Sequence, residues 1–391
     1  MLNSQELDQV LEDWNYWKSP VPASVPRRIL EKLPSWTPDI AFVVQGVRRC
    51  GKSTLLTQIM NRLGIPFEDA TFANFEDPRL ASDLGHPILE AIVRRSRERV
   101  GAARPHYFFF DEIQHVSGWE KWLHAKLERP GKDHFALTGS NAALLSGDFS
   151  SALTGRHRTL ELFPFEFSEY SLFRPGALIE DYLSHGGFPR VLSYDQPREL
   201  LREYFTDILE RDVKRRVTIR STAALTQLVK AVFESMGSEV SQRSLAGLLG
   251  VSADTVGAYL DACAAAYLIL PCPYFSFSER KRTARHRKFY PIDIGLRDAV
   301  ATRTGLDLGK RLEAAVFLHL RRSRREVCFW RGKGEVDFVV QDERGITPVQ
   351  VSWDGPKERH ERAAAEFLEA FPPSNPPVFV SRFNAAAFLG T

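Results

Sequence analysis

Short apolar runs alternate with amphipathic stretches in the first part of the chain, up to about residue 165. The runs at 41–44, 106–110 and 134–137 have the length and the β-branched or aromatic content of buried strands. Strands that alternate with helical segments are typical of a parallel sheet with helices on its faces. This part is therefore predicted to be an α/β domain.

The rest of the chain carries different patterns. Residues 166–236 have helical spacing, broken by a Gly-Gly-Phe-Pro sequence at 186–189, and are predicted to form a helical lid or linker. Residues 241–270 predict two helices joined by a turn. Farther on, an apolar helix at 312–320 precedes three strand-like runs, at 326–331, 335–341 and 346–353.

The strongest chemical signal follows the first apolar run, where the sequence reads G-x-x-x-x-G-K-S before a predicted helix. Gly46 and Gly51 let the backbone curl so that its N–H groups face phosphate. Lys52 would reach the β and γ phosphates, and the Ser53 hydroxyl would ligate Mg²⁺. The predicted ATP-binding residues are Gly46, Arg48, Arg49, Cys50, Gly51, Lys52, Ser53, Thr54, Ser140 and Asn141.

Two carboxylates end the aromatic run at 106–110. Asp111 would hold the Mg²⁺ shell, and Glu112 would act as the general base on the attacking water. By itself such a pair more often marks the surface end of a strand. The phosphate loop upstream favours the catalytic interpretation of Asp111 and Glu112, because each motif supplies the context that the other needs.

The run at 134–137 also ends in polar residues. Thr138, Ser140 or Asn141 would contact the γ phosphate or the water if this end of the sheet faces the ligand. The alternative is turn chemistry around Gly139 and an N-cap near Asn141. The sequence favours neither reading for any single residue.

The order of motifs resembles a prokaryotic family of AAA+ ATPases that joins this core to a winged helix and a restriction-endonuclease-like domain. The similar segments are GVRRCGKSTLL, FFFDEIQ, LTGSNAALL, LTGRHRTLELFPFEF and GGFPRVL. The resemblance implies a five-stranded parallel sheet with helices on both faces, and assembly into a homo-oligomeric ring or partial ring. It also makes Arg156 a candidate catalytic arginine finger, acting in cis or from a neighbouring subunit, although a lone arginine is usually a surface charge.

The resemblance sets the predicted domain boundaries. The fold class is an α/β P-loop NTPase followed by a helical and winged-helix region and a restriction-endonuclease-like α/β domain. The predicted parts are an N-terminal helical segment (1–35), the AAA+ domain (36–165), a helical lid (166–236), a winged helix (237–305) and an inactive nuclease-like domain (306–391).

The predicted helix-turn-helix has an unfavourable outer face for DNA. Its first helix would turn leucines inward, at 245, 248 and 249, and its second helix would bury Val256, Tyr259, Leu260 and Cys263. The outward positions of that second helix include Asp254 and Asp261 and no basic residue. Such a surface fits a structural or protein-contact role better than base reading.

The segment 280–288 is different, because six of its nine residues are basic. It falls where the hairpin of a wing is expected, and it suits phosphate contact without sequence readout. The alternatives are a solvated loop or a loop that docks on the acidic ATPase domain. The predicted DNA-binding residues are Arg280, Lys281, Arg282, Arg285, Arg287 and Lys288.

The C-terminal runs fit a nuclease pattern without its ligands. Asp337 matches the metal-binding Asp of that pattern, but Gln350 and Ser352 stand where Glu-x-Lys is expected. A neutral amide is a poor substitute for a metal-ligating carboxylate, and serine supplies no cation. The domain is predicted to be folded but inactive, with Glu313 and Asp337 as remnants.

The distribution of charge along the chain indicates where a polyanionic partner would bind. The 52 basic and 49 acidic residues give a net charge of only +3, but residues 201–333 carry 24 basic and 14 acidic residues. The longest apolar stretch, at 262–275, contains two prolines, so no transmembrane helix is expected. The N-terminus does not resemble a secretion signal and the four cysteines form no CxxC pair, which favours reduced thiols in the cytoplasm and no zinc site.

Together these patterns predict an ATP-hydrolysing motor or switch that acts on DNA, with ATP and Mg²⁺ as cofactors and no nuclease activity. Two other functions stay open. One is a signalling ATPase that controls protein partners, and the other is a nuclease gated by ATP.

Overall fold

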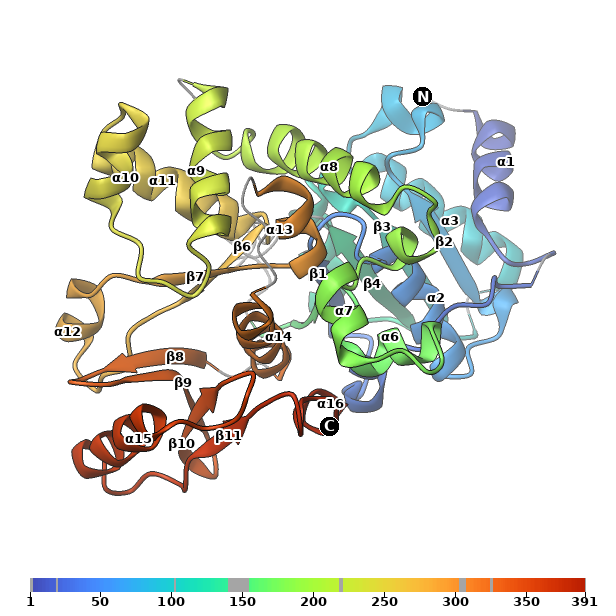
Figure 1. Ribbon diagram of the computed structural model, residues 1–391. Coiled ribbons are helices and arrows are strands. Elements are labelled where there is room, and N and C mark those ends of the chain that lie inside the picture. Colours follow the sequence, from blue (N-terminus) through green and yellow to red (C-terminus); the bar gives the residue numbers. More distant parts are fainter. Residues whose placement is uncertain are drawn as a thin grey trace. The chain divides into compact units, whose positions relative to one another are not determined.

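The computed structural model describes residues 3–18, 20–101, 103–139, 155–217, 221–301, 307–323 and 326–390. The chain forms two compact units, Met1–Leu162 and Phe163–Thr391. Each unit is built around its own sheet (Figure 1). The predicted division of residues 166–391 into a lid, a winged helix and a nuclease-like domain lies within the second unit and stays a prediction.

The N-terminal unit contains a five-stranded, fully parallel sheet in the order β2-β3-β4-β1-β5. The prediction of a parallel α/β core is therefore confirmed. The strands are β1 (Ala41–Gly46), β2 (Ala70–Asn74), β3 (His106–Asp111), β4 (Asp133–Gly139) and β5 (His157–Leu162), and the helices are α1 (Ser4–Trp14), α2 (Lys52–Arg62), α3 (Pro87–Val100) and α4 (Trp119–Glu128).

Alternating side chains of these strands reach both faces, which explains why the strands are apolar throughout. On one face, Phe108, Phe110 and Phe135 pack in one buried cluster with residues of α1, α3 and α4. On the other face, the ring of Phe109 lies against Trp36 and is stacked on Phe72. The carboxyl ends of the parallel strands share one edge of the sheet, and the phosphate loop follows β1 there.

The first half of the C-terminal unit is helical, as the spacing predicted. The Gly-Gly-Phe-Pro break ends α7, where Gly186 is the C-cap with a φ of 73° and leaves no room for a Cβ beside Asp293. The helices of this part are α6 (Phe167–Phe173), α7 (Ile179–His185), α8 (Pro197–Asp207) continued by a π-helix (Ile208–Val213), α9 (Thr222–Glu234), α10 (Gln242–Leu249) and α11 (Ala253–Ala265).

Helices α10 and α11 form the predicted helix pair, each capped by a serine side chain, Ser241 and Ser252. The four residues predicted to face inward on α11 are buried. Leu248 of α10 was also predicted to face inward, but 72% of its surface is exposed. Strands β6 (Ile269–Cys272) and β7 (Lys288–Pro291) then pair in antiparallel fashion, but the chain between them includes helix α12 (Glu279–Ala284) instead of a tight hairpin turn.

The last part of the C-terminal unit contains a second sheet, in the order β11-β10-β9-β8. Phe317 of α14 contacts Phe338 of this sheet, and Phe367 of α15 contacts Trp330. The predicted apolar helix and three strands are present, whereas β11 and the last helices were not predicted. The elements are α13 (Ile294–Val300), α14 (Leu308–Arg322), β8 (Glu326–Arg331), β9 (Glu335–Asp342), β10 (Gly345–Val351), α15 (Glu358–Ala370), β11 (Val378–Val380) and α16 (Ala385–Gly390).

Candidate active site

The phosphate loop connects the carboxyl end of β1 to the first turn of α2. Glycine is required at both ends of this loop. A Cβ on Gly46 would lie 2.0 Å from the carbonyl oxygen of Leu162, and Gly51 caps α2 with a φ of 100°, which other residues rarely adopt. The sequence therefore forces a tight curl directly before the helix N-terminus, where backbone N–H groups favour anions.

Lys52 is buried and lies along this loop. Its Nζ donates to the carbonyl oxygens of Gly46 and Val47, each at 3.3 Å, and lies 4.0 Å from Oε1 of Glu112. The ammonium group is therefore held by neutral acceptors and one carboxylate at the edge of the sheet. A phosphate group would offer it stronger, charge-assisted hydrogen bonds.

Three hydroxyl and carboxyl groups meet at the ends of β3, β4 and α2. Ser53 Oγ donates to Asp111 Oδ2 at 2.6 Å, and the Thr138 hydroxyl donates to the other oxygen of the same carboxylate. Burial raises the pKa of Asp111, and the hydrogen bonds from Ser53 and Thr138 oppose that shift. Hard oxygen ligands of this kind fit Mg²⁺, so Ser53 and Asp111 are suited to hold it.

Glu112 follows Asp111 in a left-handed backbone conformation, with a φ of 55°, which is uncommon for a residue with a side chain. Its backbone N–H donates to Thr138 Oγ1 at 2.9 Å, and its carboxylate accepts a hydrogen bond from Gln114. Thr138 thus positions both acidic residues. The strained backbone turns Glu112 toward the loop, near Lys52.

A second acidic group lies beside Glu112. Among the described residues, Glu76, Glu112 and His115 are the three whose ligand atoms lie within 4.8 Å of one another. The imidazole of His115, whose Nε2 lies 3.7 Å from Glu76 Oε1, and Arg48 at 3.3 Å lower the pKa of Glu76 to about 2 despite partial burial. Arg48, predicted to bind ATP, is thus paired with Glu76 in this structure.

Two features of the loop were not predicted. The guanidinium of Arg27, from the segment before the sheet, is buried and donates to the Cys50 carbonyl oxygen at 2.9 Å. Nothing in the local sequence distinguishes Arg27 from its neighbour Arg28, which is only partly buried. The thiol of Cys50 is buried and donates to the Leu162 carbonyl oxygen at 3.5 Å, and burial raises its pKa.

The other predicted residues divide into three groups. Arg49 and Thr54 are exposed on the loop and the first turn of α2, while Ser140 and Asn141 lie outside the described residues.

Arg156 lies at the amino end of β5, beside Ala41, whereas the phosphate loop follows the opposite end of β1. Five residues of strand, roughly 17 Å, separate the two ends. Arg156, whose guanidinium contacts the Leu127 carbonyl, therefore does not reach the phosphate loop of its own chain.

Comparison with known proteins agrees with this geometry. Residues 39–171 match a family model described as "AAA domain". The phosphate loop and the parallel sheet of the N-terminal unit thus lie in the part of the chain that is similar to AAA domains. Residues 176–307 match a domain of unknown function, a match that leaves the winged helix unconfirmed.

Two relatives cover most of the chain. An uncharacterized protein of Haemophilus influenzae is 29% identical over 347 residues, which are 83% of this chain and 85% of that protein. An uncharacterized protein of Methanocaldococcus jannaschii, MJ1544, is also 29% identical, over 85% of this chain and 79% of its own length. The arrangement that joins the AAA domain to the C-terminal unit thus recurs in a bacterium and an archaeon.

Solved structures show weaker likeness. The replication initiator DnaA bound to AMPPCP and single-stranded DNA is 15% identical, with a TM-score of 0.30, over 60% of this chain and 84% of that one. Cdc6p from Pyrobaculum aerophilum is 11% identical, with a TM-score of 0.28, over 68% of this chain and 86% of that one. The assignment of the AAA domain therefore rests on the family match and on the sheet itself.

Outside the AAA domain, the predicted DNA-binding residues do not behave alike. Lys288 is removed from that set, because its side chain is 1% exposed and its Nζ donates to Glu335 Oε1 at 2.5 Å. Arg282 is paired with Glu326, and Arg287 with Asp261 at 3.0 Å. The side chains of Arg280 and Lys281 are exposed and have no hydrogen bond or ion pair to another described residue.

The carboxylates of the predicted nuclease-like part form a partly buried cluster. Glu313 accepts a hydrogen bond from the Tyr290 hydroxyl at 2.6 Å, and Asp337 accepts one from the Val351 N–H at 2.8 Å. Burial, with repulsion from Glu313, raises the pKa of Asp337 to about 8. Gln350 is bonded to the backbone at both ends of its amide, so it is not free to bind a metal.

No described helix combines the length and the apolar character needed to span a bilayer.

Proposed function

We propose that this chain is an ATP-hydrolysing motor or switch that acts on DNA, by translocation on or remodelling of duplex or branched DNA. The observation that carries the DNA part is the pair of exposed basic side chains on α12, Arg280 and Lys281. Both lie in the most basic segment of the sequence and lack an acidic partner among the described residues. Cations of this kind favour a phosphate backbone without reading bases.

The residues of the AAA domain divide the work of hydrolysis. Lys52 would exchange its two carbonyl acceptors for the β and γ phosphates, while the curled loop supplies backbone N–H groups. Ser53 and Asp111 would hold Mg²⁺, which supplies charge neutralisation at the phosphates. Glu112 would take the proton of the attacking water once its carboxylate is released from Gln114.

Arg156 supports a homo-oligomer. Because it lies at the amino end of the strands, it would complete the site of an adjacent subunit as an arginine finger acting in trans. A ring or partial ring provides such an arrangement, since each subunit then presents the same two surfaces to its neighbours.

Three contacts favour a protein without nuclease activity. The amide of Gln350 is occupied by backbone groups, the Lys288 ammonium is paired with Glu335, and Asp337 is neutral below about pH 8. A cleavage site needs ionised carboxylates and a free cation. An ATP-gated nuclease is the alternative, and it requires that Mg²⁺ or Mn²⁺ produce plasmid nicking that Asp337→Ala abolishes.

The test is the steady-state ATPase rate at low salt with no DNA and with single-stranded, duplex or branched DNA. We expect at least one form to stimulate the rate, and expect the stimulation to fall as salt rises. The double substitution Arg280→Ala and Lys281→Ala should weaken DNA binding and leave the basal rate unchanged. An ATPase rate that no DNA form alters would overturn the proposal in favour of a signalling ATPase with protein partners.

A further inference from the structure

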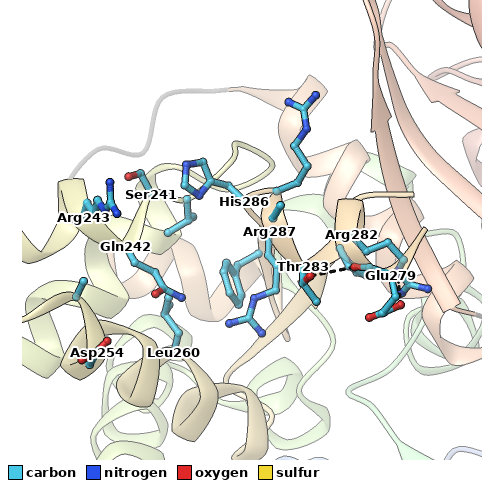
Figure 2. A pocket seen from close by; sticks show the side chains of 16 residues that line it. Ser241, Gln242, Arg243, Asp254, Leu260, Glu279, Arg282, Thr283, His286 and Arg287 are labelled. Carbon is cyan, nitrogen blue, oxygen red and sulfur yellow. Dashed lines mark hydrogen bonds and ion pairs between the residues drawn. The ribbon is translucent and has the colours of Figure 1, made fainter. Parts of the chain in front are cut away.

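A cavity of the C-terminal unit lies between the helix pair and the basic segment, with a volume of about 970 Å³ (Figure 2). One wall is the start of α10, with Ser241, Gln242 and Arg243. The other wall is formed by residues 282–287. Figure 2 shows the side chain of His286 extending from the basic segment toward Ser241 and Gln242. The two walls therefore meet over one polar cleft within a single unit.

The cleft has a surplus of available hydrogen-bond donors. The side chains of Gln242, Arg243 and His286 have no hydrogen bond or ion pair to another described residue. Arg285 is exposed and lies over the ring of Tyr274, 5.1 Å from its centroid, a stacked position that leaves its N–H groups at the edge for an anion. Arg243 and Arg285 are thus two cations, one on each wall, that have no carboxylate partner among the described residues.

Two acidic residues, Asp254 and Glu279, line the cleft, against four arginines, Arg243, Arg282, Arg285 and Arg287. Glu279 is 3.8 Å from Arg282, and Asp261 of α11 is paired with Arg287. The pair between Asp261 and Arg287 also fastens the basic segment across α11. The outer face of α11, where a groove-reading helix would contact bases, is therefore partly covered, and the open surface beside it is the cleft.

The size of the cleft selects among nucleic acids. Its volume is near the upper end of the roughly 300–1,000 Å³ typical of pockets for small ligands. A few nucleotides of one strand fit such a space, whereas a duplex, whose major groove alone is about 12 Å wide, would contact only the rim. The side chains of Gln242 and His286 add hydrogen-bonding groups for the bases that a single strand exposes.

We infer that this cleft binds a single-stranded nucleic-acid segment, with Arg243 and Arg285 holding successive phosphates from opposite walls. The inference rests on the proposed action on DNA and names the strand form and the residues that hold it. Arg243 enters the set of DNA contacts although the basic segment does not contain it. Arg280 and Lys281 do not line the cleft, so their substitution tests the DNA contacts of the proposed function that lie outside it.

The experiment measures anisotropy of a labelled oligothymidine of about 12 nucleotides with the full-length protein over a range of salt concentrations. We expect Arg243→Ala and Arg285→Ala each to weaken binding about fivefold or more and to reduce the salt slope by about 0.7, the value for one phosphate contact in a single strand. A hairpin duplex should bind more weakly than the single strand, and its affinity should change less in both variants.

The two sets of variants separate the cleft inference from the proposed action on DNA. If Arg243→Ala and Arg285→Ala bind the oligothymidine as the wild type does, while Arg280→Ala with Lys281→Ala does not, the cleft inference is wrong and the proposed function stands. If no variant alters binding and no DNA alters ATPase, the proposed function itself is wrong. Equal competition by polyglutamate of matched charge would identify an acidic protein segment as the occupant and would overturn the single-strand inference.

Discussion

The two units contain similar polar residues in opposite surroundings. In the AAA domain, Asp111, Glu112 and Lys52 gather at the edge of a parallel sheet, next to a loop that exposes Ser53 and Thr54. In the C-terminal unit, Lys288 is buried, Glu313 and Asp337 are partly buried, and the three groups already bond to a second carboxylate, a tyrosine and a backbone N–H. Carboxylates and a lysine form a site for chemistry only where ligand can replace their partners. The first site is open in this sense and the second is closed.

The largest expected effect tests whether a neighbouring subunit supplies an arginine finger to the open site. Arg156→Ala should lower ATP turnover about 10³-fold or more if the arginine finger comes from a neighbour. Mixing this variant with Glu112→Gln should restore activity, because some interfaces then combine an intact Glu112 with an intact Arg156. The measurement is the ATPase rate of the mixture against each variant alone. Mixing that restores nothing, at unchanged oligomer size, would contradict a role in trans.

The second-largest expected effect concerns the proposed general base, Glu112. Glu112→Gln should reduce turnover about 10²- to 10⁴-fold while nucleotide binding is retained, since the amide cannot accept the proton of water. Lys52→Ala should lose ATP affinity as well, because it removes the loop ammonium that is proposed to bind the β and γ phosphates. Fluorescent-nucleotide binding beside single-turnover hydrolysis separates the two defects. A Glu112→Gln protein that turns over normally would remove Glu112 from its proposed role.

The closed cluster predicts a stability effect that depends on pH. The folded protein keeps the proton of Asp337 up to about pH 8, while an unfolded chain releases it near pH 4. The carboxyl of Asp337 therefore costs the wild type stability as pH rises between these values, and Asp337→Asn lacks this contribution. We expect the Tm of the variant minus that of the wild type to increase by several degrees from pH 5 to pH 8.

Asp354→Asn, at an exposed position after β10, is the matched control and should show a Tm difference that does not vary with pH. A constant difference for Asp337→Asn as well would mean that its carboxyl is ionised in the folded protein. The cluster would then be less enclosed than its burial indicates, and a metal-dependent role for it would gain support.

The comparison also shows which features the sequence could reveal. The phosphate loop and the strand that ends in Asp111 are local patterns, so their positions followed from spacing. Lys288 misled the prediction because it belongs to a basic run, and its burial arises from a partner 47 positions away, on β9. Arg27 was missed for the same reason, since its contact with the Cys50 carbonyl joins segments 23 positions apart. Charge patterns locate a surface, but only the packed chain decides which charges remain on it.

The smallest expected effect tests how the open site keeps its shape without ligand. Arg27→Lys retains the charge but loses the planar donor that reaches the Cys50 carbonyl, so the loop should be held less firmly. We expect the KM for ATP to rise about threefold to tenfold, because one charge-assisted bond to a buried carbonyl is lost, with a smaller change in kcat. Arg28→Lys, whose neighbour is Glu31 at 3.9 Å, is the control and should leave both constants unchanged. If both variants resemble the wild type, Arg27 does not position the phosphate loop, and the glycines at the two ends of the loop are sufficient to fix its curl.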